Sequence, residues 1–262
     1  MRTNYSQRVI PAGRPVAGML AVLWLAGSLC VAADPPASET ETLQQFRQAA
    51  EKTYQAVREQ YRAATTNVTA AWTFARACFD LAEFSRNDTE RESLALEGMS
   101  ASRQSIILKS DLAEGHYYLG MNQGQLARTK MLGALKLVHE MADTFKLASS
   151  LDAHVDYAGP DRCLGLLYRD APGWPTSVGS KSKARTYLLK AAQLEKDFPE
   201  NQLNLVESYL QWSERKNALA MSNTVQAVMV KARATLTGAV WACSWHDWDK
   251  RWDAAREKLG KK

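Results

Sequence analysis

Histidines are few in this 262-residue chain, four in all, and the side chains able to perform acid–base or metal chemistry form no complete catalytic motif. His139 and Glu140 begin like the zinc-protease motif H-E-x-x-H, but Asp143 stands where that motif needs its second histidine. His246 and Asp247 come nearest to a catalytic pair, and the chain contains no G-x-S-x-G nucleophile elbow. We therefore predict no catalytic residue, no metal ligand and no cofactor, and we expect that the protein is not an enzyme.

Binding chemistry has a better candidate at the predicted start of a helix. Gly179-Ser180-Lys181 would place backbone N–H groups and a cation at a helix N-terminus, a position that favours an anion. The alternative is that Ser180 caps the helix in the ordinary way. The segment is not a Walker A loop, because Ser180 separates the glycine from the lysine.

The residues before this helix predict a rigid loop that presents an aromatic side chain. Pro172 and Pro175 fix φ on both sides of Trp174, while Gly173 and Gly179 allow turns that other residues resist. Trp174 is therefore a candidate anchor for a partner, because tryptophan is enriched in interface hot spots. The alternative is that Trp174 fills the gap between neighbouring helices.

Opposite charges stand next to each other on the N-terminal side of the loop. Asp161-Arg162 and Arg169-Asp170 can form local ion pairs that pin the loop, or they can be solvated charges. We expect the segment 159–182 to face a partner or a small ligand. The predicted partner- or ligand-binding residues are Asp161, Arg162, Tyr168, Arg169, Trp174, Ser180 and Lys181.

Apolar residues recur at helical spacing along almost the whole chain from residue 41 onward. Leu43, Phe46, Ala50 and Val57, for example, would lie on one face of a helix. Alternation of β-branched residues is absent, so we expect no sheet. The predicted helices cover residues 41–64, 68–84, 88–108, 112–120, 130–148, 164–168, 183–195, 203–212 and 225–236.

Weak internal repetition indicates how these helices are arranged. Residues 109–114 (K-S-D-L-A-E) can be laid on residues 195–200 (E-K-D-F-P-E), which corresponds to two units of about 43 residues. The fold class that follows is all-α, an irregular tetratricopeptide-like α-solenoid of paired antiparallel helices. Such folds usually bind other molecules rather than transform them.

Four tryptophans mark the C-terminal end. Trp241, Trp245, Trp248 and Trp252 are 4, 3 and 4 residues apart, so all four would lie along one helical face. We expect this stripe to be the seam that docks the last helix onto the solenoid. A ligand wall and a contact between copies in a homo-oligomer are the alternatives.

The N-terminus has the features of an export signal. Residues 1–15 carry three arginines and no acid, and residues 16–31 form an uncharged, largely apolar run. Val31-Ala32-Ala33 supplies small residues at −3 and −1, so cleavage before Asp34 is expected. The sixteen-residue run is shorter than the roughly 20 residues that a membrane span needs.

This pattern divides the chain into a signal peptide (1–33), a flexible segment (34–40) and a single helical-repeat domain (41–262). We expect a periplasmic or secreted protein with no transmembrane span in the mature chain. Lipid anchoring is not expected, because Leu29 precedes Cys30 where a lipobox has a small residue. Removal of three arginines and no acid lowers the net charge from +5 to +2. No basic stripe remains for nucleic acid to bind.

Cysteine usage is that of a protein without a disulfide framework. Cys78, Cys163 and Cys243 remain after the leader, so at most one disulfide can form within a chain. None lies in a C-x-x-C motif of the thioredoxin or haem-attachment kind. We interpret the three as small core residues, and the sequence leaves open whether one pair is oxidised.

Three segments already described resemble a known family. Residues 159–183, with G-P-D-R, A-P-G-W-P and G-S-K, are similar to the T component of tripartite ATP-independent periplasmic (TRAP) transporters, the TatT family. The helix at 184–194 and the F-P-E-N turn at 198–201 belong to the same likeness, which covers residues 112–210. The resemblance implies an exported, tetratricopeptide-like protein that associates with the transporter's periplasmic substrate-binding protein. The missing lipobox departs from the lipid-anchored members.

Two functions are therefore open at this point. The first is a binding module that works beside a periplasmic substrate-binding protein in solute uptake, with a small-molecule ligand as a further option. The second is a cell-envelope scaffold of the same fold that is unrelated to transport. Neither function requires an enzyme, a cofactor or nucleic acid.

Overall fold

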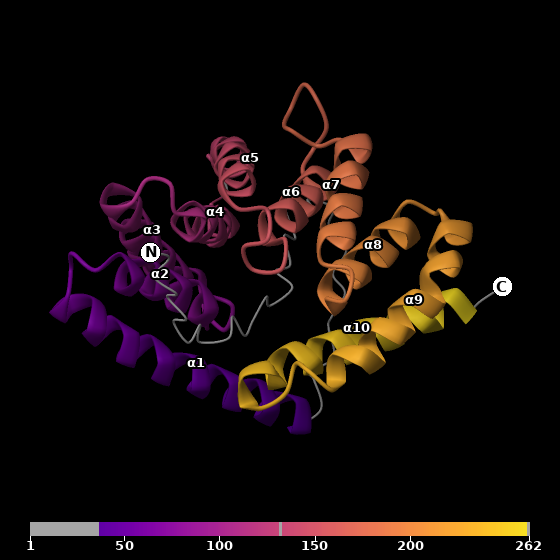
Figure 1. Ribbon diagram of the computed structural model, residues 1–262, viewed down its shortest axis with the longest axis horizontal. Helices are drawn as coiled ribbons and strands as arrows, with labels where there is room; N and C mark the ends of the chain where they lie inside the picture. Colours follow the sequence, from indigo (N-terminus) through magenta and orange to yellow (C-terminus); the bar gives the residue numbers. More distant parts are fainter. Residues whose placement is uncertain (1–36, 131–132, 261–262) are drawn as a thin grey trace, which may run out of the picture.

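The computed structural model describes residues 37–130 and 133–260, and these residues are predominantly helical (Figure 1). The all-α prediction is confirmed, and a lone bridge between Gly173 and Gly179 is the nearest approach to a strand in the described ranges. The helices are α1 (Ala37–Ala63), α2 (Val68–Ala82), α3 (Asp88–Leu108), α4 (Ala113–Arg128), α5 (Ala134–Leu151), α6 (Gly159–Asp170), α7 (Lys181–Leu194), α8 (Pro199–Gln211), α9 (Arg215–Arg233), the 3₁₀ turn η1 (Ala239–Trp241) and α10 (Ala242–Gly260).

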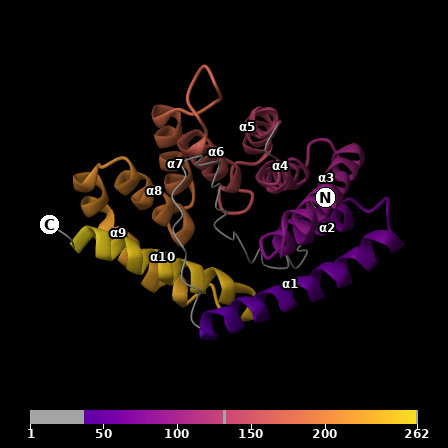
Figure 2. The ribbon, with the colours of Figure 1, turned by 180° about the vertical axis from the view of Figure 1, so that it is seen from behind.

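Successive helices pair as antiparallel hairpins, α2 with α3, α4 with α5, α6 with α7 and α8 with α9. The hairpins stack because α2 also contacts α4, α5 contacts α6, and α6 contacts α8. Figures 1 and 2 show the hairpins arranged in an arc, with α1 and α10 running below it and meeting each other. This is the irregular tetratricopeptide-like α-solenoid that the periodicity predicts.

Side chains at the helix starts explain several of the boundaries. Asn67 accepts hydrogen bonds from the backbone N–H groups of Thr69 and Ala70, and Asn87 accepts one from Glu90. Such caps satisfy N–H groups that have no partner inside the helix. Asn67 and Asn87 thus cap α2 and α3.

Several predicted boundaries are wrong. Residues 37–40 form the first turn of α1 rather than part of a flexible segment, while the predicted signal peptide lies outside the described residues. Helix α6 starts at Gly159 rather than at residue 164, because Pro160 in the first turn is compatible with a helix and buried charges replace the expected apolar residues. Helix α9 starts at Arg215, ten residues before the predicted start at residue 225. Its first turn is polar and faces the surface, so it lacks the apolar spacing on which the prediction relied.

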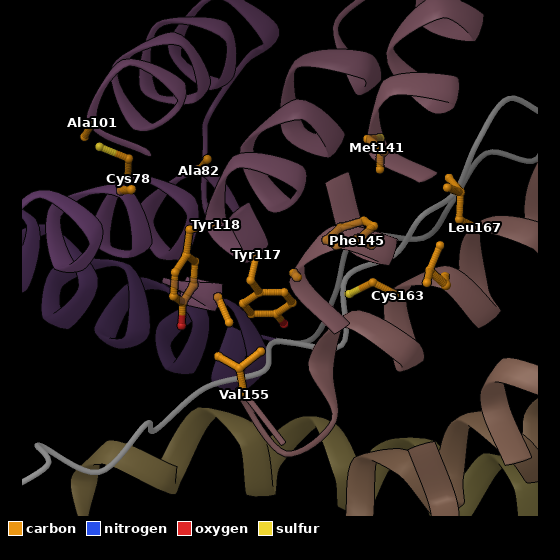
Figure 3. Packing of buried hydrophobic residues seen from close by; sticks show 14 of the residues in the cluster. Cys78, Ala82, Ala101, Tyr117, Tyr118, Met141, Phe145, Val155, Cys163 and Leu167 are labelled. Carbon is orange, nitrogen blue, oxygen red and sulfur yellow. The ribbon is translucent and has the colours of Figure 1, made fainter. Parts of the chain in front are cut away.

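Two clusters of buried apolar residues hold the arc together. The first lies among α1 to α7 and is centred on Tyr117, Phe145 and Leu164 (Figure 3). The second joins α6, α7, α8, α9 and α10 around Leu203 and Trp248. No helix in the described part of the chain is long and apolar enough to cross a membrane.

Two of the three described cysteines are the small core residues we expected, and the third is not. Cys78 and Cys163 are buried in the first cluster (Figure 3), and Cys243 is half-buried on α10. None of the three forms a disulfide. Burial raises the pKa of the Cys78 and Cys163 thiols, so both stay neutral and unreactive.

The C-terminal tryptophans form the predicted seam. Trp245, Trp248 and Trp252 lie on α10 and are buried, with Trp248 fully inaccessible. Trp241 is buried as well, but it belongs to η1. The prediction that all four tryptophans lie along one helix is therefore wrong for Trp241. Trp248 packs edge-on against Phe198, with ring centroids 5.5 Å apart. Burial in the core excludes these rings as a ligand wall or a contact between copies.

Candidate functional site

The loop between α6 and α7 is closed at its base by backbone hydrogen bonds. The N–H of Gly179 donates to the carbonyl of Pro172 at 2.9 Å, and the N–H of Ser180 donates to the carbonyl of Tyr168 at 2.8 Å. A Cβ at Gly179 would lie 2.0 Å from the carbonyl oxygen of Ala171, so this closure requires glycine. The loop therefore has the rigidity that its prolines and glycines predict.

Trp174 sits on this loop, which projects beyond the ends of α6 and α7 (Figure 1). Its side chain is 89% exposed, more than any other large apolar side chain that the structure describes. The alternative interpretation, in which Trp174 fills a gap between helices, is wrong. A large, uncovered indole on a loop closed by backbone hydrogen bonds is the strongest feature of this surface.

Ser180 and Lys181 lie at the base of the loop and have partners within the protein. The Ser180 hydroxyl caps α7 by accepting a hydrogen bond from the N–H of Lys183 at 3.3 Å, which confirms the N-cap interpretation. Lys181 is half-exposed, pairs with Glu214 at 2.8 Å and lies 5.5 Å from the ring centre of Trp212. Lys181 therefore ties the start of α7 to the turn between α8 and α9.

Tyr168 and Arg169 end α6, but they do not reach the exposed side of the loop. Tyr168 is buried and stacks on Tyr187, with ring centroids 5.6 Å apart. Arg169 pairs with Asp170 at 2.7 Å and 2.8 Å, so the predicted ion pair is confirmed. Arg169 also donates to the Ser208 hydroxyl at 3.1 Å, which ties α6 to α8.

Asp161 and Arg162 lie at the other end of α6 and are buried there, so they do not pin the loop. They also do not pair with each other, because each has a partner of opposite charge elsewhere in the protein. Asp161 accepts from Lys190 at 2.9 Å, whereas Arg162 pairs with Asp156 at 3.0 Å. Both charges fix the packing of α6, and they correct our prediction that they belong to one binding surface.

Arg162 has a further structural task in the turn that precedes α6. Asp156, Tyr157 and Ala158 all have positive φ, which is uncommon for residues other than glycine. Arg162 donates to the carbonyls of Asp156 and Tyr157 at 3.2 Å and 3.0 Å, and Asn201 donates to the carbonyl of Tyr157 at 3.0 Å. These bonds hold the left-handed turn in place.

A charged groove of about 890 Å³ is the feature that sequence reasoning missed. It is lined by residues of α1, α6, α8 and α10, of the turn between α2 and α3, and of the end of α4. Charges that line it are matched inside the protein, since Arg47 pairs with Glu90, and Arg128 pairs with Glu83. The residues that line the groove come from helices far apart in sequence, so no local sequence motif predicts it.

Arg251 is the centre of the densest network in this groove. Its guanidinium holds Glu207 through two hydrogen bonds, of 2.8 Å and 2.7 Å, and donates to Glu200 at 2.8 Å. It also donates to Asp247 at 3.1 Å and to the side-chain oxygen of Asn204 at 2.6 Å. All of these contacts either join α10 to α8 or lie within α10. One feature of the sequence could have indicated this network: Glu200, Asn204 and Glu207 are spaced so that they share one face of α8.

The first turn of α1 contacts α10 beside the groove. Glu39 pairs with Lys250 at 2.9 Å and lies 3.3 Å from His246, whose ring contacts Phe46 at 5.6 Å. Hydrogen bonds from Lys250 and His246 hold the pKa of Glu39 below its usual value. The N-terminal helix thus joins the two ends of the arc.

The pH dependence of stability tests the environment of Asp247. Burial raises the pKa of Asp247 from 3.8 to about 6, and the nearby Glu200 and Glu207 add to the rise against the pull of Arg251. The folded state therefore holds this proton more tightly than the unfolded state, and the resulting stability is lost as pH rises from about 4 through 6.

We expect Asp247→Asn to remove this loss. Urea midpoints measured for wild type and variant at intervals from pH 4 to 7 should show the wild type losing stability relative to the variant across that window. Parallel profiles would mean that Asp247 titrates normally in the folded protein.

Within the described ranges, no group of three or more His, Cys, Asp or Glu side chains is placed so that it could hold a metal ion. His139 and His246, the histidines with the most suggestive neighbours in sequence, lie on α5 and α10. What the arrangement offers is an exposed tryptophan loop on a rigid helical frame and a groove whose charges are internally paired.

Comparison with known proteins supports this fold. Residues 35–153 match the family model of "Regulator of microtubule dynamics protein 1-3". A crystal structure of TTC0263, a thermophilic tetratricopeptide repeat protein of Thermus thermophilus, is similar over 84% of this chain and 99% of that chain, with a TM-score of 0.58 and 19% identity. The crystal structure of MamA is similar over 77% of this chain and 98% of that chain, with a TM-score of 0.47 and 17% identity. A search of curated protein sequences gives no significant match.

The chain is accordingly a tetratricopeptide-like helical repeat protein. Arrays of this class present extended surfaces to other molecules, most often other proteins. The exposed tryptophan loop is the feature by which this particular array departs from a plain stack of hairpins.

Proposed function

We propose that this protein is a non-catalytic interaction scaffold whose protein partner docks on the Trp174 loop. The observation that carries the proposal is the 89% exposure of a tryptophan on a loop closed by hydrogen bonds. Covering an indole removes a large apolar area from water, and a backbone that is already fixed loses little entropy on binding. Trp174 therefore has the properties of a hot-spot anchor.

The inner surface of the arc is the usual alternative for a repeat protein. In this chain α1 and α10 meet across that side, and Arg47, Arg128 and Arg251 of the groove are paired with carboxylates of the same chain. Opening such pairs to a partner costs free energy that covering Trp174 does not. This difference favours the loop as the partner-facing surface.

We propose further that the partner is a periplasmic substrate-binding protein of TRAP-type solute uptake. Support comes from the resemblance of residues 159–201 to the TatT family and from the export signal pattern in residues 1–33. In this account the leader is cleaved and residues 41–262 act as a single domain in the periplasm. The Trp174 loop lies within the segment that carries the resemblance.

A cell-envelope scaffold unrelated to transport is the second candidate. The match of residues 35–153 to a family model whose description names no transporter favours it. The two candidates share the loop and differ only in the partner, so the identity of the bound protein separates them.

Calorimetric titration of the purified protein with a periplasmic substrate-binding protein of a TRAP-type transporter from the same organism tests the proposal. Trp174→Ala should weaken binding by about 2 kcal/mol or more, the range of an interface hot spot, and leave the melting temperature unchanged. Ile107→Ala is the matched control, because Ile107 is 77% exposed on α3, away from the loop. Equal affinities for wild type and Trp174→Ala would refute the docking site. Loss of binding by both variants would show a general effect of apolar surface.

A further inference from the structure

A second pocket, separate from the Trp174 loop, opens between α1, α2 and the η1 turn. Its volume is about 420 Å³, within the usual range of small-molecule sites. It touches the charged groove only at Cys243, which lines both. The pocket is lined by Phe46, Ala49, Ala50, Thr53, Val57, Trp72, Thr73, Arg76, Ala77, Asp80, Ala239, Val240 and Cys243.

The walls of this pocket are mainly apolar, and several of them stay accessible. Phe46, Val57 and Trp72 are only half-buried, and Val240 is 38% exposed. Large side chains of this kind are usually covered when they lie in a concavity. An apolar occupant would remove their surface from water at about 25 cal/mol per Å².

The polar side chains of the pocket are committed to the protein. The Thr53 hydroxyl donates to the carbonyl of Ala49 at 3.0 Å, and the Thr73 hydroxyl donates to the carbonyl of Thr69 at 2.7 Å. Each threonine therefore has its hydrogen-bonding hydroxyl engaged within its own helix.

The charges of the pocket also balance. Arg76 and Asp80 are one turn apart on α2, and their side chains lie 3.7 Å from each other. Their opposite charges cancel, so the pocket has no net charge with which to select an ion. A charged ligand would lose its hydration here without gaining a counter-charge.

From these contacts we infer that the pocket binds an uncharged, apolar small molecule. The volume of the pocket limits the size of this ligand, and the half-buried aromatic and aliphatic walls favour an apolar one. Because the charges of Arg76 and Asp80 balance, the pocket does not favour a ligand that carries a net charge. Since α1 and η1 supply opposite ends of the sequence, occupancy would also hold the first and last helices together.

N-phenyl-1-naphthylamine, an uncharged apolar fluorophore, is the probe for this site. We expect saturable binding to the wild-type protein with one site per chain and a blue-shifted emission. The anionic analogue 8-anilinonaphthalene-1-sulfonate should bind about tenfold more weakly or worse. Tighter binding of the anion would overturn the assignment of ligand charge.

Thr73→Phe fills the pocket from the middle of α2 and should reduce probe affinity about tenfold or more without lowering the melting temperature. Thr186→Phe is the matched control, because Thr186 makes the same bond to the carbonyl four residues earlier but lies on the exposed face of α7. It should bind the probe like wild type. Unchanged binding by Thr73→Phe, or no saturable binding at all, would overturn the inference. The inference would also be overturned if the wild-type protein bound no probe and Thr73→Phe abolished self-association or partner capture. The pocket would then be a contact surface for another protein.

Discussion

Trp248→Ala should lower the free energy of unfolding by about 3–5 kcal/mol, the cost of truncating a fully buried large side chain. Trp248 has no accessible surface, and its ring lies edge-on to Trp245 with centroids 4.9 Å apart. Its indole N–H also donates to Glu200 at 2.5 Å, so truncation removes one hydrogen bond from a buried carboxylate. Urea unfolding monitored by circular dichroism measures the change.

Trp174→Ala is the control for this measurement, because it deletes the same side chain where it is 89% exposed. We expect its stability to stay within about 0.5 kcal/mol of wild type, as for most surface substitutions. A Trp248→Ala variant as stable as the Trp174→Ala variant would mean that α10 does not dock through its tryptophans.

Arg251→Ala should be as damaging, with an expected loss of about 3–5 kcal/mol, because it leaves buried charge without a partner. Glu200 is completely buried and accepts one of its hydrogen bonds from Arg251, and Glu207 gives both of its oxygens to the same guanidinium. Arg251→Lys should recover only part of the loss, because an ammonium group cannot make the two parallel hydrogen bonds to Glu207. Urea unfolding at pH 7 compares these variants.

Arg256→Ala serves as the matched control on the same helix. Its side chain is 56% exposed and pairs with Asp253 one turn away, a geometry worth less than about 1 kcal/mol. If Arg251→Ala and Arg256→Ala were equally stable, the network between α8 and α10 would contribute nothing to the docking of the last helix.

Periodicity was enough to predict most of the helices and the seam. The tryptophans of α10 are spaced so that one face is apolar, and a helix with one apolar face must bury it. Asn87 caps α3 because an asparagine side chain at this position can accept a hydrogen bond from the first turn of the helix. These features depend on residues close in sequence, which a single chain displays directly.

The candidate site could be predicted only in part, for the opposite reason. The rigidity of the Trp174 loop follows from local prolines and glycines, whereas its exposure depends on where the neighbouring helices end. Asp161 and Arg162 are adjacent in sequence, but their partners Lys190 and Asp156 come from other elements, so adjacency misled the prediction of a local pair. The groove and the apolar pocket join both ends of the chain, and no local pattern reports such contacts.

Photo-crosslinking from position 174 tests most directly the claim that the loop contacts a partner protein. A benzoylphenylalanine in place of Trp174, irradiated in cells that produce the full chain, should give one predominant adduct, identified by mass spectrometry as a periplasmic substrate-binding protein. The same group in place of Ile107, an exposed position on α3, should give no such adduct. Absence of an adduct at 174, or the same adducts from both positions, would contradict the account.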